Sequence, residues 1–173
     1  MTLLLATPCH HDRVVTALVD LLARMAFRGA YRLLSVYWFL ARPETHGVCV
    51  GVWHGREVLL IKNSYKPYFS LPGGGPHRGE AGPETGAREL REEVGLHVPP
   101  DQLRAAFEIV STEEHKRDHV RFFEVDLSSR PPITIDRREV VWAEFVDSRD
   151  VLSRPLGPVM RAYLEDALRR RGS

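Results

Sequence analysis

The stretch that decides the fold runs from Leu71 to Leu96 and reads LPGGGPHRGEAGPETGARELREEVGL. It opens on a glycine-rich loop and passes into a segment bounded by Pro83 and Gly95. Proline suits the first position of a helix, and glycine suits the left-handed position just beyond the last one. The bounded segment therefore predicts an α-helix of about three turns that follows a flexible loop.

The acidic residues of this predicted helix share one face. At about 100° per residue, Glu89, Glu92 and Glu93 fall within about 100° of one another. Leu90 and Val94 form an apolar face that would pack on a core. Like charges three or four residues apart destabilise a helix by about 0.2–0.5 kcal/mol per pair, so the acidic face needs a compensating charge. A hard divalent cation, which prefers carboxylate oxygens, would supply it.

The glycine-rich loop in front of the helix suggests that the acidic face is a binding site. A polar helix face rich in Glu and Arg is usually only solvated, and Arg88 could balance one of its charges. However, residues 73–75 are all glycine, which lets bare backbone approach a phosphate closely, and Glu80 adds a fourth carboxylate. A flexible loop followed by four acids predicts a site for Mg²⁺-bound phosphates.

Residues 74–96 resemble the Nudix box at every defined position. Gly74 is followed after five residues by Glu80, and after seven more by Arg88-Glu89-Leu90-Arg91-Glu92-Glu93-Val94-Gly95-Leu96. The resemblance implies a Nudix-like α/β/α sandwich with a mixed β-sheet, to which this chain adds an N-terminal helical extension. It also implies a metal-dependent hydrolase that cleaves a pyrophosphate bond in a nucleoside diphosphate linked to another moiety. The implied cofactor is Mg²⁺ or Mn²⁺.

The resemblance further implies a role for each residue of the box. The implied metal ligands are Glu89, Glu92, Glu93, the backbone carbonyl of Gly74, and Glu80 as a supporting or metal-linked carboxylate. Arg88 would hold the glutamates and the loop in place. The general base is expected outside the box, at Glu139, with Glu113 and Glu114 as competitors. The implied catalytic set is therefore Arg88, Glu89, Glu92, Glu93 and Glu139.

The substrate is predicted only by class. The expected substrate-binding residues are Gly73, Gly74, Gly75, Tyr65 and Phe69, the two aromatic rings stacking on a base unless they pack in the core. The chain lacks the subfamily marks that we sought around the box, so a nucleotide, a nucleotide sugar and an oxidised nucleoside triphosphate stay open. The alternative functions are a catalytically silent nucleotide-binding sensor and a membrane-associated pyrophosphohydrolase. The intact glutamates of the box disfavour the sensor.

Regular patterns around the box predict the other elements. Alternating apolar residues favour strands at 48–52 and 58–61, joined by a tight turn at His54-Gly55. Further strands are expected at 104–110, 119–127 and 140–146, and a terminal helix at 159–170. This order of elements indicates a mixed sheet with helices on both faces.

The N-terminal region predicts a helix outside the box. The segment from Val14 to Leu40 is strongly apolar, but charged residues recur at four-residue intervals, namely Asp20, Arg24, Arg28 and Arg32. The uninterrupted apolar run at 33–41 is too short to span a membrane, which needs about 20 residues. We therefore expect one amphipathic helix, or two helices hinged near Gly29. Packing on the core, a homodimer and a peripheral membrane contact all stay open for it.

The remaining N-terminal residues favour a loose tail. The cluster Cys9-His10-His11-Asp12 carries metal-ligating residue types, but its place at the terminus favours disorder over a metal site. We expect residues 1–42 to form this tail and the amphipathic helix, and residues 43–173 to form the hydrolase domain.

Composition limits the classes of partner. With 173 residues, 43% of them hydrophobic, the chain is long enough for one globular domain with a real core. A net charge of +1 gives no reason to expect nucleic acid as a partner, so a small nucleoside diphosphate derivative is the expected one. Two cysteines exclude a disulfide scaffold and fit the reducing cytoplasm.

Overall fold

Six strands form one mixed sheet in the computed structural model, which describes residues 10–172, with side chains from Thr16 onward. The strands are β1 (Glu44–His54), β2 (Glu57–Asn63), β3 (Gly73–Gly74), β4 (Arg104–Ser111), β5 (Arg117–Asp126) and β6 (Val140–Asp147). Their order is β4-β5-β1-β2-β6, and β3 pairs with β1. Strands β1 and β5 run parallel, whereas the other pairs are antiparallel, which confirms the predicted mixed sheet.

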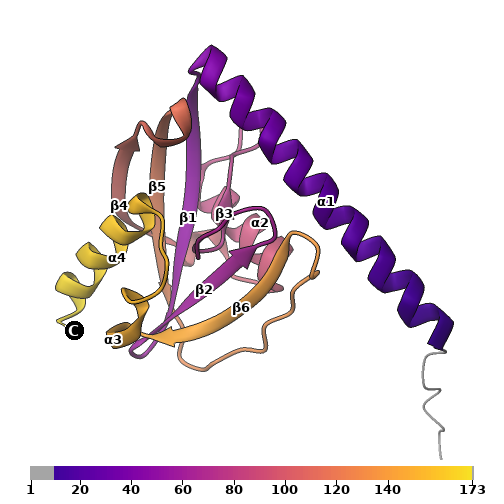
Figure 1. Ribbon diagram of the computed structural model, residues 1–173. Coiled ribbons are helices and arrows are strands. Elements are labelled where there is room, and N and C mark those ends of the chain that lie inside the picture. Colours follow the sequence, from indigo (N-terminus) through magenta and orange to yellow (C-terminus); the bar gives the residue numbers. More distant parts are fainter. Residues whose placement is uncertain (1–9, 173) are drawn as a thin grey trace, which may run out of the picture.

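Alternation along the strands gives the sheet two buried faces. Val48, Val50 and Val52 of β1 point to the face that carries Leu90 and Val94 of helix α2 (Gly82–Val94). The opposite face packs against α3 (Ser148–Val151) and α4 (Pro158–Arg171). Figure 1 shows α2 on one side of the sheet and α3 with α4 on the other. The expected α/β/α sandwich is therefore confirmed.

Most of the predicted element boundaries lie within a few residues of the observed ones. The terminal helix expected at 159–170 is α4, and the strand expected at 140–146 is β6. Strand β1 begins at Glu44, four residues earlier than predicted, because Glu44 pairs with Arg117 of β5. Strand β3 and helix α3 were not predicted, nor were the short 3₁₀ helices η1 (Pro100–Gln102) and η2 (Glu113–His115).

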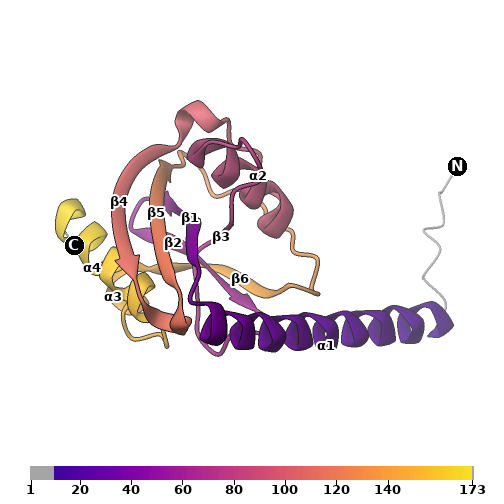
Figure 2. The ribbon, with the colours of Figure 1, turned by 90° about the horizontal axis from the view of Figure 1, so that it is seen from above.

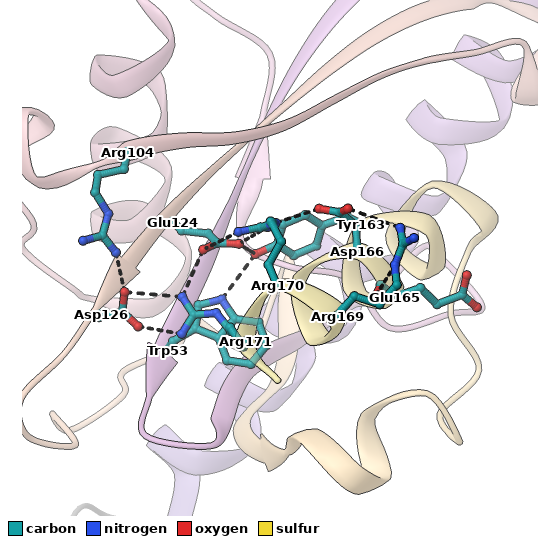
Figure 3. A network of polar contacts seen from close by, with 10 residues as sticks. All are labelled: Trp53, Arg104, Glu124, Asp126, Tyr163, Glu165, Asp166, Arg169, Arg170 and Arg171. Carbon is teal, nitrogen blue, oxygen red and sulfur yellow. Dashed lines mark hydrogen bonds and ion pairs between the residues drawn. The ribbon is translucent and has the colours of Figure 1, made fainter. Parts of the chain in front are cut away.

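An ionic cluster fastens the end of α4 to the sheet. Figure 3 shows Arg170 and Arg171 reaching across to β5. Arg170 donates to Oε1 of the buried Glu124 at 2.7 Å, and Arg171 donates to its Oε2 at 3.0 Å. The hydroxyl of Tyr163 donates to Glu124 Oε1 as well, at 2.9 Å. The carboxylate is buried but paired, so its charge can be tolerated away from water.

The N-terminal region forms one continuous helix, α1 (His10–Ala41). The alternative of two helices hinged near Gly29 is therefore wrong. A single internal glycine costs a helix only about 1 kcal/mol, and contacts on both sides of Gly29 hold α1 to the domain. The helix begins before the expected Val14, so residues 10–12 are helical rather than loose. Cys9, and the side chains of the other members of its cluster, lie outside the described residues.

Helix α1 docks by one face along the domain. Figures 1 and 2 show its C-terminal end beside β1 and its N-terminal end projecting past the sandwich. Trp38 is buried, and Tyr31 packs on Tyr65 with ring centroids 5.2 Å apart. On the opposite face of α1, many large apolar side chains are exposed. Within residues 10–172, no helix has the length and apolar character needed to cross a membrane.

Candidate active site

The glycine-rich loop lies against β1 and the acidic helix. Strand β3 places Gly73 opposite Cys49 and Gly74 opposite Val48. A Cβ atom at Gly73 would lie 2.1 Å from the backbone oxygen of Val48, and one at Gly74 would lie 2.3 Å from Oε1 of Glu89. At Gly73 only glycine fits, because the neighbour is backbone, whereas at Gly74 a side chain would displace the Glu89 carboxylate. The loop backbone is thereby brought within reach of the helix carboxylates.

Helix α2 begins and ends where its sequence predicts. Pro83 lies in its first turn, and the backbone N–H of Ala81 donates to the Glu84 carboxylate at 3.0 Å. Gly95 closes the helix in the left-handed conformation, with φ of 70°. These caps fix the helix register, and Leu90 and Val94 fix its rotation by packing in the core. The acidic face is therefore presented toward the loop.

Arg88 gathers the carboxylates and the loop around one guanidinium group. Its Nε donates to Glu80 Oε1 at 3.0 Å, and its Nη1 donates to Glu89 Oε1 at 2.8 Å and Glu92 Oε2 at 3.0 Å. Its Nη2 donates to the carbonyl oxygen of Gly75 at 3.0 Å. Hydrogen bonds from Arg88, and then from the backbone of His77, lower the pKa of Glu80 to about 2.

Glu93 is the buried acid of the group, and Glu89 is partly buried. Glu93 is 8% exposed, and its Oε2 accepts a hydrogen bond of 2.8 Å from the backbone N–H of Gly73. Burial raises the pKa of Glu93 to about 8, and burial also raises the pKa of Glu89. Glu92 is more open, with half of its side chain exposed. Two acids thus lie in a setting that disfavours their charged form until a cation joins them.

The predicted metal ligands lie on one helix face and the adjacent loop, but their oxygen atoms do not converge on a common position for an ion. Among residues 16–172, no three His, Cys, Asp or Glu side chains converge as the ligands of an ion would. Glu80, Glu89 and Glu92 converge on Arg88 instead. The chemistry of the donors nevertheless fits a hard divalent cation, because carboxylate and backbone carbonyl oxygens are what Mg²⁺ and Mn²⁺ prefer.

Glu139 approaches this group from a distant part of the chain. Its charge contributes to the raised pKa of both Glu89 and Glu93, although burial contributes more. Its own carboxylate accepts a hydrogen bond of 3.0 Å from the Tyr65 hydroxyl. The competitor Glu114 forms an ion pair with Lys116 at 3.4 Å. Of the acids outside the box considered as bases, Glu139 is the one that acts electrostatically on Glu89 and Glu93.

A cavity of about 420 Å³ opens beside the loop. Gly73, Gly74 and Gly75 form part of its wall. The remaining wall includes Lys66, Tyr68 and the competitor base Glu114, together with Trp38 and Lys116, which sequence reasoning did not assign to the site. The volume suits a small organic ligand. Trp38 belongs to α1, and no sequence motif signalled that this helix reaches the cavity.

The two aromatic residues predicted to stack on a base are packed against other side chains. Tyr65 lies between α1 and the site, with its ring 6.2 Å from that of Phe27. Phe69 packs edge-on against Trp142, with ring centroids 5.0 Å apart. The structure therefore brings the glycines to the cavity but holds these two rings in contacts within the protein.

The chain matches a known family over most of its length. The model of the NUDIX domain family matches residues 43–167. Over 103 residues the chain is 25% identical to the uncharacterized Nudix hydrolase YvcI of Bacillus subtilis (strain 168). That match covers 59% of this chain and 65% of the relative, so the aligned part falls short of the relative's whole length.

Solved structures share the fold at low sequence identity. The MutT protein of Methanosarcina mazei Go1 superposes with a TM-score of 0.65 at 20% identity, covering 76% of this chain and 98% of that one. The C. elegans Ap4A hydrolase gives 0.63 at 18% identity, covering 74% and 98%. The NUDIX domain of Shewanella oneidensis NrtR, solved with ADP ribose, gives 0.65 at 20% identity, covering 75% and 89%. At these identities the likeness concerns the fold.

Proposed function

The chain belongs to the NUDIX domain family, and on that premise we propose that it is a Nudix-type pyrophosphohydrolase. Its substrate would be a nucleoside diphosphate linked to another moiety, cleaved at the pyrophosphate bond. The observation that carries this proposal is the arrangement around Arg88, which binds three acids and the glycine loop beside the cavity. The acids alone would repel a pyrophosphate, which is itself strongly anionic. A cation bound among them would offset this repulsion.

A divalent cation is the cofactor in this proposal, Mg²⁺ or Mn²⁺. The residues that would hold it are Glu89, Glu92, Glu93, the backbone carbonyl of Gly74, and Glu80 in support. When bound, the ion would neutralise the phosphate charge and lower the pKa of a water molecule. Because burial raises the pKa of Glu93, and partial burial raises that of Glu89, these two carboxylates have the most to gain from a nearby positive charge.

The protein's own groups would orient the reaction. Arg88 would fix the glycine loop through the Gly75 carbonyl, and thereby fix the backbone that faces the phosphates. The Glu139 carboxylate would accept a proton from the attacking water. Water would attack one phosphorus atom and the bridging P–O bond to that atom would break. The products would be a nucleoside monophosphate and the phosphorylated second moiety, which is pyrophosphate when the substrate is a nucleoside triphosphate. Proton transfer of this kind typically contributes 10²–10⁴-fold to a rate.

The cavity beside the loop would receive the nucleoside part of the substrate, next to its phosphates. Its wall combines Trp38 with the cations Lys66 and Lys116 and the acid Glu114, so both flat and polar groups can be received. The relative solved with ADP ribose has the same fold, which agrees with a nucleoside diphosphate derivative as partner. Nucleotides, nucleotide sugars and oxidised nucleoside triphosphates are the substrate classes to be compared.

With two cysteines in the chain, the proposed location is the reducing cytoplasm.

A catalytically silent sensor is the weaker alternative. A sensor has no need of the acids that would bind metal, yet Glu89, Glu92 and Glu93 are all present on one face and in contact with the loop or Arg88. The exposed apolar face of α1 agrees with either of two further partners, a second copy of the chain or a membrane surface.

A phosphate-release screen tests the proposal. The full chain would be assayed against dNTPs, oxidised nucleotides, nucleotide sugars, dinucleotides and ADP-ribose, with Mg²⁺, with Mn²⁺ and after chelation. We expect turnover of at least one class that is lost on chelation and falls at least 100-fold in Glu92→Gln and Glu93→Gln. Glu165→Gln, at an exposed position of α4, is the matched control and should keep its rate. Turnover that survives chelation and both substitutions would refute the assignment.

A further inference from the structure

One face of helix α1 is fully engaged with the domain. Arg28 donates to the Ser64 carbonyl oxygen at 3.0 Å, and Asp20 accepts from Arg138 at 3.0 Å. The ring of Trp38 is buried, with the Lys116 ammonium 4.0 Å from its centroid. These contacts are spread from Asp20 to Trp38, so α1 is held along most of its described length. Its other face cannot turn inward without breaking them.

The outward face is apolar along its length, with the exposed Arg32 at its edge. We define the outward stripe as Leu18, Leu22, Met25, Gly29, Leu33, Val36 and Leu40, which lie on one side of the helix. Leu33 and Leu40 are 75% exposed, and the other large members are 55–59% exposed. A continuous apolar surface of this kind on a folded domain marks a place where something else binds.

The outward stripe reads the same from both ends. From Gly29 its members lie four, seven and eleven residues away in each direction. Eleven residues make about three turns, so Leu18, Gly29 and Leu40 stay in line along the helix. If two copies lie antiparallel with a two-fold axis at Gly29, Met25 meets Leu33 of the second copy, and Leu18 meets Leu40. This is the self-complementarity that a symmetric dimer requires.

The centre of the outward stripe has room for a close crossing. A Cβ atom at Gly29 would meet nothing within 4 Å, and Ala26 and Ala30 beside it are exposed as well. Small side chains at the crossing point let two helix axes approach to about 8 Å. The large side chains then interdigitate on either side of the crossing. A stripe with its smallest residues at the middle therefore suits two antiparallel helices that approach most closely at Gly29.

The apolar area is sufficient for a stable pair. Ten large apolar side chains on the outward half of α1 are at least 44% exposed, namely the six of the outward stripe and Val19, Leu21, Tyr37 and Phe39 on its two sides. If each loses roughly 70 Å² on association, the interface reaches about 700 Å² on each partner, which is close to the usual size of a specific interface.

The charges favour a second copy over a lipid surface. An amphipathic helix on a membrane presents basic side chains to anionic head groups. Here Arg24 and Arg28 donate instead to backbone carbonyls of the domain, at Arg137 and Ser64, and Asp20 is paired with Arg138. Of the three arginines of α1 whose side chains are described, Arg24 and Arg28 are therefore directed toward the protein itself, and Arg32 is exposed.

We propose that the outward stripe is the interface of a homodimer, in which two α1 helices pack antiparallel about a two-fold axis at Gly29. The helix thereby serves two surfaces. Its inward face holds loops that border the candidate active site, and its outward face joins the two chains. The interface does not depend on the proposed hydrolase function, so each can be tested without the other.

Light scattering and disulfide trapping test the interface. The full chain should elute at twice its monomer mass. In a Cys9→Ser background, Gly29→Cys should form a disulfide-linked dimer with itself under mild oxidation. Leu18→Cys alone should not, but an equal mixture of Leu18→Cys and Leu40→Cys should. The background protein, which keeps Cys49, is the control for unwanted crosslinks. Self-crosslinking of Leu18→Cys would show a parallel pair and overturn the proposal.

A charge substitution separates dimerisation from folding. Leu33 is highly exposed in the single chain, so Leu33→Glu should leave the fold intact and convert the dimer to a monomer. Val110→Glu introduces the same charge at an exposed apolar position on β4 and should stay dimeric. A wild-type chain that is monomeric overturns the proposal. If that monomer floats with vesicles of phosphatidylcholine and phosphatidylglycerol, the outward stripe belongs to a lipid surface.

Discussion

The hydroxyl of Tyr65 donates a hydrogen bond of 3.0 Å to Oε1 of Glu139, which joins the loop after β2 to the segment before β6. The Tyr65 ring in turn packs against Phe27 and Tyr31 of α1. Helix α1 therefore holds the tyrosine that holds the proposed base. Because α1 precedes the residues matched by the family model, this chain supports its site with an element of its own.

Removing the Tyr65 hydroxyl should slow the reaction without unfolding the protein. A hydrogen bond to a charged group is worth about 1.5–3 kcal/mol, and about 1.4 kcal/mol is a factor of ten in rate. We expect kcat to fall about tenfold in Tyr65→Phe and at least 100-fold in Glu139→Gln. Tyr37→Phe, at an exposed tyrosine of α1, is the control. An unchanged kcat in Glu139→Gln would remove this residue from the role of base.

Alanine at the three loop glycines should have three different effects. At Gly73 a Cβ meets the backbone of β1, so Gly73→Ala should lower both stability and activity. At Gly74 it meets only the end of the Glu89 side chain, which can move aside. Gly74→Ala should therefore keep most of its stability but lose activity by at least tenfold. Gly75→Ala meets only the His46 carbonyl at 3.8 Å and should behave like the wild type. Thermal unfolding and kcat distinguish these outcomes, and equal effects at all three positions would contradict the geometry.

Trp38 should influence substrate binding more than turnover. Its side chain lines the cavity from α1, whereas the neighbouring Tyr37 is exposed and does not line the cavity. We expect KM to rise about tenfold in Trp38→Ala, with a smaller change in kcat, because the residue lies away from the acids around Arg88. Tyr37→Ala should leave KM unchanged. If both variants alter KM equally, the effect comes from a general loosening of α1.

The cluster around Glu124 predicts a loss of stability in acid. Burial alone would raise the pKa of Glu124, but hydrogen bonds from Arg170, Arg171 and Tyr163 outweigh it and lower the pKa below its ordinary value of 4.5. The group therefore contributes its stabilisation above pH 4.5, and this contribution is lost as the pH falls through the lower folded pKa.

Glu124→Gln should make this dependence visible. At neutral pH we expect the free energy of unfolding to fall by about 1–3 kcal/mol, because two arginines lose their buried counter-charge. The difference from wild type should shrink as the pH drops below 4.5. Urea unfolding at several pH values measures both, and Glu165→Gln serves as control. A difference that stays constant down to acid pH would exclude this carboxylate as the titrating group.

Much of the site could be predicted because it is built from one local segment. Pro83 and Gly95 mark the ends of α2, and the helical repeat alone brings Glu89, Glu92 and Glu93 to one face. The strands were equally accessible, since each buried face of the sheet imposes an alternation of apolar residues. These features depend on neighbours within a few residues, which the sequence displays directly.

Other features depended on contacts between distant segments. Tyr65 and Phe69 have aromatic rings of the kind that stack on a base. Whether such a ring is free depends on which segment packs against it, here α1 for Tyr65 and Trp142 for Phe69. Trp38 lines the cavity because α1 docks across η2 and β1, and no spacing in the chain encodes that docking. The absence of a hinge at Gly29 has the same origin, since contacts on both sides of it outweigh the cost of one glycine.

The sequence by itself therefore determined the acidic helix, its caps, the glycine loop and the order of strands, because backbone preference and side-chain periodicity are local. The tertiary structure alone decided which acid outside the helix approaches Glu89 and Glu93, which side chains line the cavity, and which face of α1 stays exposed. Those outcomes follow from the packing of segments many residues apart, whose free energy is summed over contacts that no single stretch of sequence contains.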